Sequence, residues 1–93
     1  MSAYVVIHAT VKDADKFKEY GAAAGPIVKA HNGELVCGGH LKSVLHGEES
    51  RERCVIIKFA DTAAAEGWYN SPEYQAVIPV RNEALESVFI VVE

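Results

Sequence analysis

The sequence predicts a single α+β domain in which two helices pack on one antiparallel sheet, in the chain order β-α-β-β-α-β. Two observations predict this class. The segments 4–11 and 53–60 are almost wholly apolar and rich in β-branched residues, as in central strands. Each is followed by an Asp and then by apolar residues at helical spacing. The chain has 93 residues, enough for one core, so we expect one domain over residues 1–93.

The composition is that of an ordinary globular domain and excludes several classes of protein. Hydrophobic residues make up 49% and charged residues 24% of the chain, and no apolar run is long enough to span a bilayer. Residues 1–10 lack a basic lead and a cleavage pattern, so we expect a strand there and the cytoplasm as the location. The net charge is −4 and the nine Lys and Arg residues are scattered, which argues against a nucleic-acid partner.

The first strand is expected at residues 4–11. Because successive side chains of a strand point to opposite faces, Val5 and Ile7 share one face and Val6 and His8 share the other. Both faces of this strand are therefore largely apolar, and one of them carries an imidazole.

The first helix is expected after Asp13, whose carboxylate suits the N-cap position. Apolar residues then recur at helical spacing as far as His31. Gly25-Pro26 predicts a kink or a restart, because proline lacks an amide hydrogen and crowds the carbonyl four residues back. Asn32-Gly33 is expected to end the helix in the left-handed conformation.

A second strand is expected over residues 34–46, with a bulge at Gly38-Gly39, and a polar turn over 47–52 leads into the third strand. In the hairpin this implies, Cys54 lies nearly opposite Val44. Cys37 is then on the order of 20 Å away, too far for a disulfide. We therefore expect two buried free thiols.

The last third of the chain predicts two short helices and a closing strand. Asp61 is expected to cap a helix over 62–69, and Ser71-Pro72 to start a second helix that Pro79 limits to about two turns. The closing strand is expected at 87–93.

This order of elements is the ferredoxin-like one, with the first and third strands in the centre of the sheet. The helices can cover only one face of the sheet, yet the strands carry apolar residues on both. A second copy of the chain would cover the other apolar face most simply. We therefore expect a homodimer whose sheets pack face to face into a dimeric α/β barrel.

Four stretches resemble a known family: YVVIHATVKDADKFKEY, HNGELVCGGH, IIKFAD, and WYNSPEYQ followed by Arg81. Together they are similar to the family called domain of unknown function 1330, over nearly the whole chain. The resemblance implies a ferredoxin-like subunit of a dimeric α/β barrel and implies no activity. Members often carry Arg after the double glycine and Glu before the Phe, where this chain has His40 and Lys58. No role is carried over for either side chain.

The stretch WYNSPEYQ has two interpretations. Trp68 is expected to pack its helix onto the sheet, as large aromatic residues on amphipathic helices usually do. Tyr69, Tyr74 and Arg81 are candidates for the mouth of a ligand pocket. For Arg81, ligand binding and structural pairing both remain open, since a guanidinium group suits either.

The strongest candidates for chemistry are His8, His40 and Lys58. His8 and Lys58 fall on the face assigned to the barrel interior, and with His40 they could hold an anionic or enolisable ligand. His8 would be the candidate catalytic residue, because imidazole transfers protons near neutral pH. The alternative is that His8 is a core histidine with a satisfied partner and that Lys58 reaches the rim.

No metal or cofactor is expected. The two Cys lack CxxC spacing and the four His are dispersed, and Gly38-Gly39 is not part of a phosphate-binding loop. Nucleophilic catalysis has little support, because Ser71 is explained as a cap and neither Cys has an evident His partner.

Two functions follow. The first is a homodimeric small-molecule-binding protein, with cofactor-independent proton transfer or oxygenation of a small aromatic or carboxylated compound as its candidate activity. The second is a non-catalytic binding or stress-related module with a packed barrel interior. A cavity lined by His8, His40 and Lys58 would favour the first.

Overall fold

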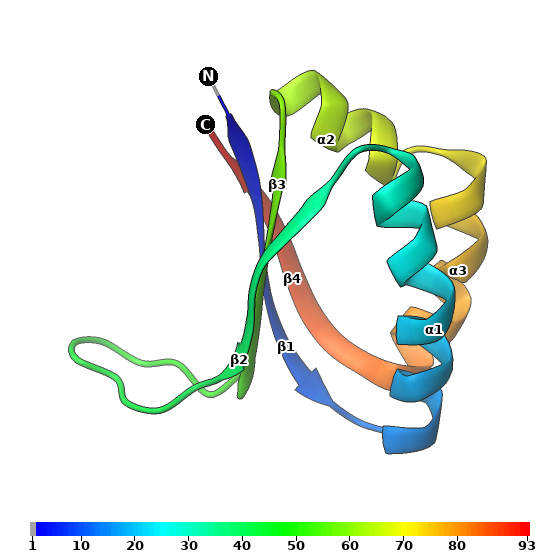
Figure 1. Ribbon diagram of the computed structural model, residues 1–93. Coiled ribbons are helices and arrows are strands. Elements are labelled where there is room, and N and C mark those ends of the chain that lie inside the picture. Colours follow the sequence, from blue (N-terminus) through cyan, green and yellow to red (C-terminus); the bar gives the residue numbers. More distant parts are fainter. Residues whose placement is uncertain (1) are drawn as a thin grey trace.

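The computed structural model describes residues 2–93 of the chain and confirms the ferredoxin-like α+β class. One face of an antiparallel sheet is covered by helices and the other is open (Figure 1). The second helical segment is split in two, so the order is β-α-β-β-α-α-β. The elements are β1 (Ala3–Val11), α1 (Ala14–Ala30), β2 (Glu34–His40), β3 (Arg53–Phe59), α2 (Thr62–Tyr69), α3 (Pro72–Ala84) and β4 (Leu85–Val92).

The strand order is β2-β3-β1-β4, so the two most apolar strands lie in the centre, as predicted. The ladder pairs Ile7 of β1 with Val55 of β3 and with Phe89 of β4. This row points toward the helices. The next row, Val6 with Ile56 and Ile90, points to the open face.

Helix α1 begins at the predicted cap, where the Asp13 carboxylate accepts hydrogen bonds from the amides of Asp15 and Lys16 at 3.0 and 3.1 Å. The predicted restart at Pro26 is wrong, because the helix runs on to Ala30. The proline frees only one carbonyl, that of Ala22, which is exposed and can bond to water. Asn32 then adopts a positive φ of 61° and ends the helix as expected.

Strand β2 ends at His40, six residues before the predicted end, and residues 41–52 form a loop. The loop extends beyond the open face of the sheet (Figure 1). A backbone hydrogen bond of 2.6 Å from Leu41 to Glu52 closes its base. The returning segment, 47–52, is rich in charged residues and is not part of a strand.

The bulge of β2 lies between Leu35 and Cys37 and not at Gly38-Gly39 as predicted. The resulting register pairs Cys37 with Ile56, and Cys54 with Gly39. The two cysteines are therefore diagonal neighbours on the open face, and the estimated separation of about 20 Å is wrong. Both are free, as predicted, but Cys37 is exposed rather than buried.

Helix α3 begins as predicted, with the Ser71 hydroxyl accepting from the amide of Tyr74 at 3.2 Å and donating to the Trp68 carbonyl at 2.8 Å. The predicted stop at Pro79 is wrong, because α3 continues to Ala84 and β4 begins at Leu85. The reason is the same as at Pro26, since the one carbonyl that Pro79 frees belongs to the exposed Gln75.

The core lies between the sheet and the helices, and Trp68 is its centre. Its side chain is 1% exposed, and its ring lies 5.4 Å from that of Phe59 and 4.6 Å from that of Tyr74, measured between centroids. Such contacts between aromatic rings add to the burial energy. The prediction that Trp68 packs its helix onto the sheet is confirmed.

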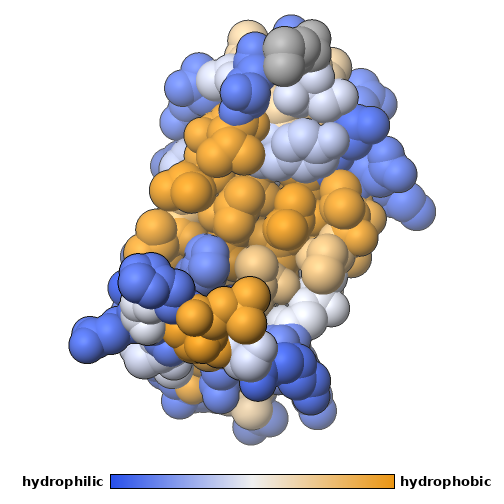
Figure 2. Space-filling view, turned by 90° about the vertical axis from the view of Figure 1, so that its left-hand side faces the viewer, coloured by the Kyte–Doolittle hydropathy of each residue, from blue (hydrophilic) through white to orange (hydrophobic). Residues whose placement is uncertain are grey.

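The opposite face of the sheet remains open and apolar. Val88, Ile90 and Val92 of β4 are 41%, 47% and 45% exposed. Figure 2 shows this face as a continuous apolar patch with a polar rim. Within residues 2–93 no helix is both long and apolar enough to cross a membrane.

Candidate functional site

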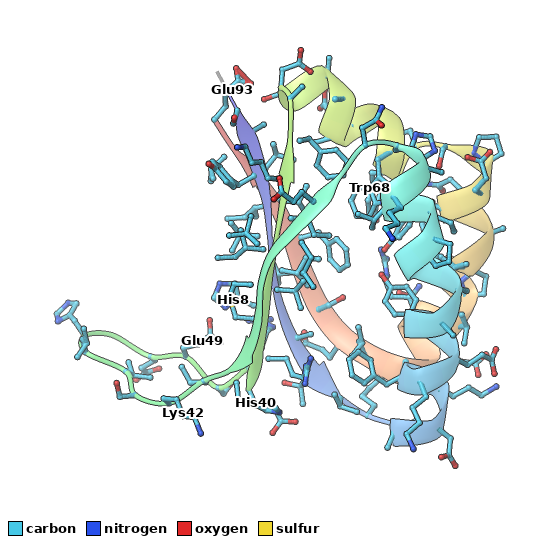
Figure 3. All side chains as sticks on the ribbon, viewed as in Figure 1. His8, His40, Lys42, Glu49, Trp68 and Glu93 are labelled. Carbon is cyan, nitrogen blue, oxygen red and sulfur yellow. The ribbon has the colours of Figure 1, made fainter. Side chains whose placement is uncertain are left out.

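The structure does not bring His8, His40 and Lys58 together. His8 and Lys58 share the open face, but they pair with Cys54 and Tyr4 at opposite ends of the sheet, about 13 Å apart along the strands. His40 pairs with Arg53, whose row faces the helices. The predicted convergence is therefore wrong, and Figure 3 shows His8 and His40 apart, at different levels of the sheet.

His8 is tied to the long loop instead. Its Nδ1 lies 3.2 Å from Oε2 of Glu49, which comes from the returning arm of the loop (Figure 3). A backbone hydrogen bond from Arg51 lowers the pKa of Glu49, and the nearby His8 lowers it further. His8 also lies directly opposite Cys54 in the ladder.

Tyr69, Tyr74 and Arg81 do lie together, as the sequence suggested. Nη1 of Arg81 donates to the hydroxyls of Tyr69 at 2.9 Å and Tyr74 at 3.3 Å. The Tyr74 hydroxyl lies 2.8 Å from that of Tyr20 on α1. The guanidinium carbon of Arg81 lies 4.9 Å above the centre of the Phe89 ring. Structural pairing therefore accounts for the contacts of Arg81.

Burial keeps two of these tyrosines protonated. The pKa of Tyr20 is raised well above its usual range, first by burial and then by its neighbour Tyr74. The pKa of Tyr74 is also raised by burial, although its hydrogen bonds with Tyr20 and Arg81 oppose the shift. Both hydroxyls therefore act as hydrogen-bonding groups and not as bases.

A cleft with a volume of about 800 Å³ lies on the helix-covered side of the sheet, between α1 and the strands. Ile7, Val55 and Ile57 form its floor. Its opposite wall is α1, where Gly21, Ala24 and Gly25 are small. A Cβ atom added at Gly21 or at Gly25 would meet no atom within 4 Å. The cleft is therefore widest where α1 carries these small residues.

This cleft was not predicted from the sequence, although the signal was present. The segment GAAAG, residues 21–25, places small residues at positions 21, 24 and 25, which share one face of a helix. Gly38, on the adjoining strand, also leaves open space around its missing Cβ. None of the predicted site residues lines the cleft.

Three polar side chains that border the cleft are buried or half-buried. The first is Tyr20, which is linked through its hydroxyl to Tyr74. The second is Trp68, whose buried indole N–H has no hydrogen-bond partner among the described residues. The third is Arg53, whose buried Nε likewise lacks a partner in residues 2–93.

Arg53 was missed because the apolar run that it opens was interpreted as a core strand. Its guanidinium carbon lies 5.0 Å from the centre of the Phe17 ring, and its Nη1 lies 3.3 Å from Nε2 of His40. Its position in the sequence could have identified it. Side chains two residues apart in a strand point to the same face, so Arg53 faces the helices together with Val55 and Ile57.

A smaller cleft of about 310 Å³ lies between α2 and β4, lined by Tyr69, Phe89 and Val91 among others. In the part of the chain that the structure describes, no group of three or more His, Cys, Asp and Glu side chains is arranged to hold a metal ion.

The fold places the chain in the class of small ferredoxin-like α+β proteins, here with an apolar cleft between helices and sheet. The family model described as a domain of unknown function, DUF1330, matches residues 2–93, and the chain belongs to that family. No curated protein matches the sequence.

Solved structures share the fold. A protein of unknown function from Rhodopseudomonas palustris, RPA0582, is 19% identical with a TM-score of 0.78, covering 98% of this chain and 80% of its own. A dimeric ferredoxin-like protein of unknown function from Jannaschia sp. CCS1 is 14% identical with a TM-score of 0.76, covering 100% and 99%. SnoaB, a cofactor-independent oxygenase from Streptomyces nogalater, is 16% identical with a TM-score of 0.70, covering 99% and 91%. At these identities the likeness establishes the fold alone.

Proposed function

We propose that the protein binds a small, largely apolar molecule in the cleft between α1 and the sheet. One observation carries this proposal: a chain of 93 residues keeps a cleft of about 800 Å³ beside its core. Small domains have little apolar area to spare, and an unfilled apolar space costs stability. Ligand pockets have volumes in this range, roughly 300–1,000 Å³, and combine apolar walls with a few polar groups.

The walls favour a planar ligand. Phe17, Trp68 and Phe89 border the cleft together with aliphatic side chains of the sheet. Aromatic faces stack on flat molecules, and the buried N–H of Trp68 would be satisfied by an oxygen acceptor on the ligand. The ligand class proposed is therefore a small aromatic or similarly flat compound that carries an oxygen.

We also propose that the protein is a homodimer joined through the open face of the sheet. The exposed apolar residues of β4 support this, and structural neighbours such as the Jannaschia protein are described as dimeric. In such a dimer the open faces form the barrel interior. The cleft lies on the opposite side of the sheet, so each subunit would hold its own ligand.

A second candidate function is oxygenation without a cofactor. It is favoured by the chain of hydrogen bonds from Arg81 through Tyr74 to the hydroxyl of Tyr20, a residue that lines the apolar cleft. Such a hydroxyl can stabilise charge that develops on a substrate oxygen. Among the lining residues the one carboxylate is Glu34, which is exposed. The lining therefore has no buried carboxylate that could take a proton from the substrate. Binding is therefore the better supported function.

The experiment that tests binding uses N-phenyl-1-naphthylamine, a neutral aromatic probe that fluoresces in apolar surroundings. The expected result is saturable binding that Gly21→Leu or Gly25→Leu weakens about tenfold or more, because either leucine fills the cleft. The matched control is Gly67→Leu, which adds the same side chain at an exposed site on α2 with open space around it. Equal binding by all of these variants would place the probe elsewhere and refute the proposal.

A further inference from the structure

We propose that the cleft selects an anionic ligand, an apolar compound carrying a carboxylate, and that Arg53 binds the carboxylate. This inference rests on the proposed function, because it concerns the ligand of the same cleft. It adds a negative charge to the proposed ligand and names the residue that binds this charge.

The first argument is the position of Arg53. It is the first residue of β3, and the ladder pairs it with Ala9 of β1 and His40 of β2. Ala9 is 4% exposed and faces the helices, so the arginine side chain starts from the covered face of the sheet. From there it crosses the Phe17 ring and borders the cleft.

The second argument is that the charge of Arg53 has no counterpart within the described chain. Among residues 2–93 no carboxylate lies within 4.0 Å of its guanidinium group. Its polar side-chain contact there is His40, and its Nε is buried without an acceptor. A half-buried guanidinium charge without a carboxylate partner is costly, so an anion in the cleft beside Arg53 would relieve a cost that the folded chain already carries.

The other two arginines of the sequence, Arg51 and Arg81, both have hydrogen-bond acceptors. Arg81 donates to Tyr69, Tyr74 and the side chain of Asn82. Arg51 donates from its Nε to Glu86 at 3.0 Å, and its Nη1 lies 3.9 Å from Glu49. Arg53 is thus the arginine whose hydrogen-bonding capacity is left for a ligand.

The third argument is the chemistry of the guanidinium group. Its Nε–H and one Nη–H point the same way and match the two oxygens of a carboxylate. The apolar walls of the cleft strengthen this pairing, because the local dielectric constant is low. Lys29 and Glu34 also border the cleft, but both are exposed and of opposite sign, so water screens their net effect.

The test compares two probes that differ in charge and not in shape, 2-naphthoate and 2-naphthamide, by isothermal titration calorimetry. Wild-type protein should bind the naphthoate at least about tenfold more tightly than the amide. Arg53→Gln should remove that preference and leave the affinity for the amide within about twofold. Arg51→Gln removes the same charge two residues away and should leave the preference intact.

The outcomes separate this inference from the proposed function. If the wild type does not prefer the naphthoate, or if Arg53→Gln keeps the preference, the inference is overturned while a cleft that binds the amide stands. If Gly21→Leu leaves the binding of both probes unchanged, or the wild type binds neither, the proposed function itself fails. A measurement on the wild type avoids any doubt about folding: naphthoate should shift the ¹⁵N resonance of Arg53 Nε, and an unmoved resonance would overturn the inference.

Discussion

The hydroxyl groups of Tyr20 and Tyr74 lie 2.8 Å apart inside the protein, although 54 positions separate them in the sequence. The contact joins α1 to α3 at the point where both helices meet the core. Tyr74 is fully buried and also accepts a hydrogen bond from Arg81. This contact therefore links the wall of the cleft to the aromatic cluster around Trp68.

The first prediction concerns alkaline pH. Burial raises the pKa of Tyr20 and of Tyr74, so both stay protonated in the folded state when an unfolded tyrosine, with a pKa of about 10, would ionise. The stability that they contribute is complete below about pH 10 and is lost as the pH rises above it. Urea unfolding between pH 8 and pH 11 should show this loss. Stability that stayed constant to pH 11 would contradict it.

The second prediction concerns the hydroxyl of Tyr74. Tyr74→Phe should lower the free energy of unfolding by about 1–3 kcal/mol, because it leaves the buried Tyr20 hydroxyl without its partner. Tyr69→Phe is the matched control. Its hydroxyl also accepts from Arg81, but the side chain is only half-buried, so the loss should be smaller. Equal losses in urea unfolding would show that the Tyr20 contact adds nothing.

The third prediction concerns the open face. Ile90→Lys places a charge in the middle of the apolar patch and should convert the proposed dimer into a monomer, measured by native mass spectrometry at micromolar concentration. Ala76→Lys adds the same charge on the exposed side of α3 and should leave the dimer intact. A dimer that survives Ile90→Lys would show that the subunits meet elsewhere.

The elements with strong local patterns could be predicted from the sequence. The alternation of β1 and β3, the caps Asp13, Asp61 and Ser71, and the burial of Trp68 all follow from one or two neighbouring residues. The two internal prolines were misjudged, because whether a helix survives a proline depends on whether water can reach the freed carbonyl. That is a property of the packed structure and not of the local sequence.

The candidate site could be predicted only in part. A bulge of one residue reverses the faces of the rest of a strand, so the bulge near Val36, and not at Gly38-Gly39, places Cys37 on the open face and Gly38 toward the helices. The sequence does not locate that bulge. The cleft is a space left by absent side chains, and it becomes visible only when α1 is placed over the sheet. Tyr69, Tyr74 and Arg81 were grouped correctly because they lie on adjoining helices, within 12 positions of one another.

The last prediction compares the effects on stability of replacing two glycines, Gly33 and Gly38, by alanine. A Cβ at Gly33 would lie 2.7 Å from Cγ1 of Val28 and 2.8 Å from the ring of Phe59, which is 2% exposed and closely packed. Gly33→Ala should therefore cost about 1–3 kcal/mol of stability, as overpacked cores do. Gly38→Ala meets no atom within 4 Å and should instead stabilise the strand by up to ~1 kcal/mol, because alanine loses less backbone entropy on folding. Urea unfolding of both variants measures the two effects. If Gly38→Ala were as costly as Gly33→Ala, the open space around the missing Cβ of Gly38 would be contradicted.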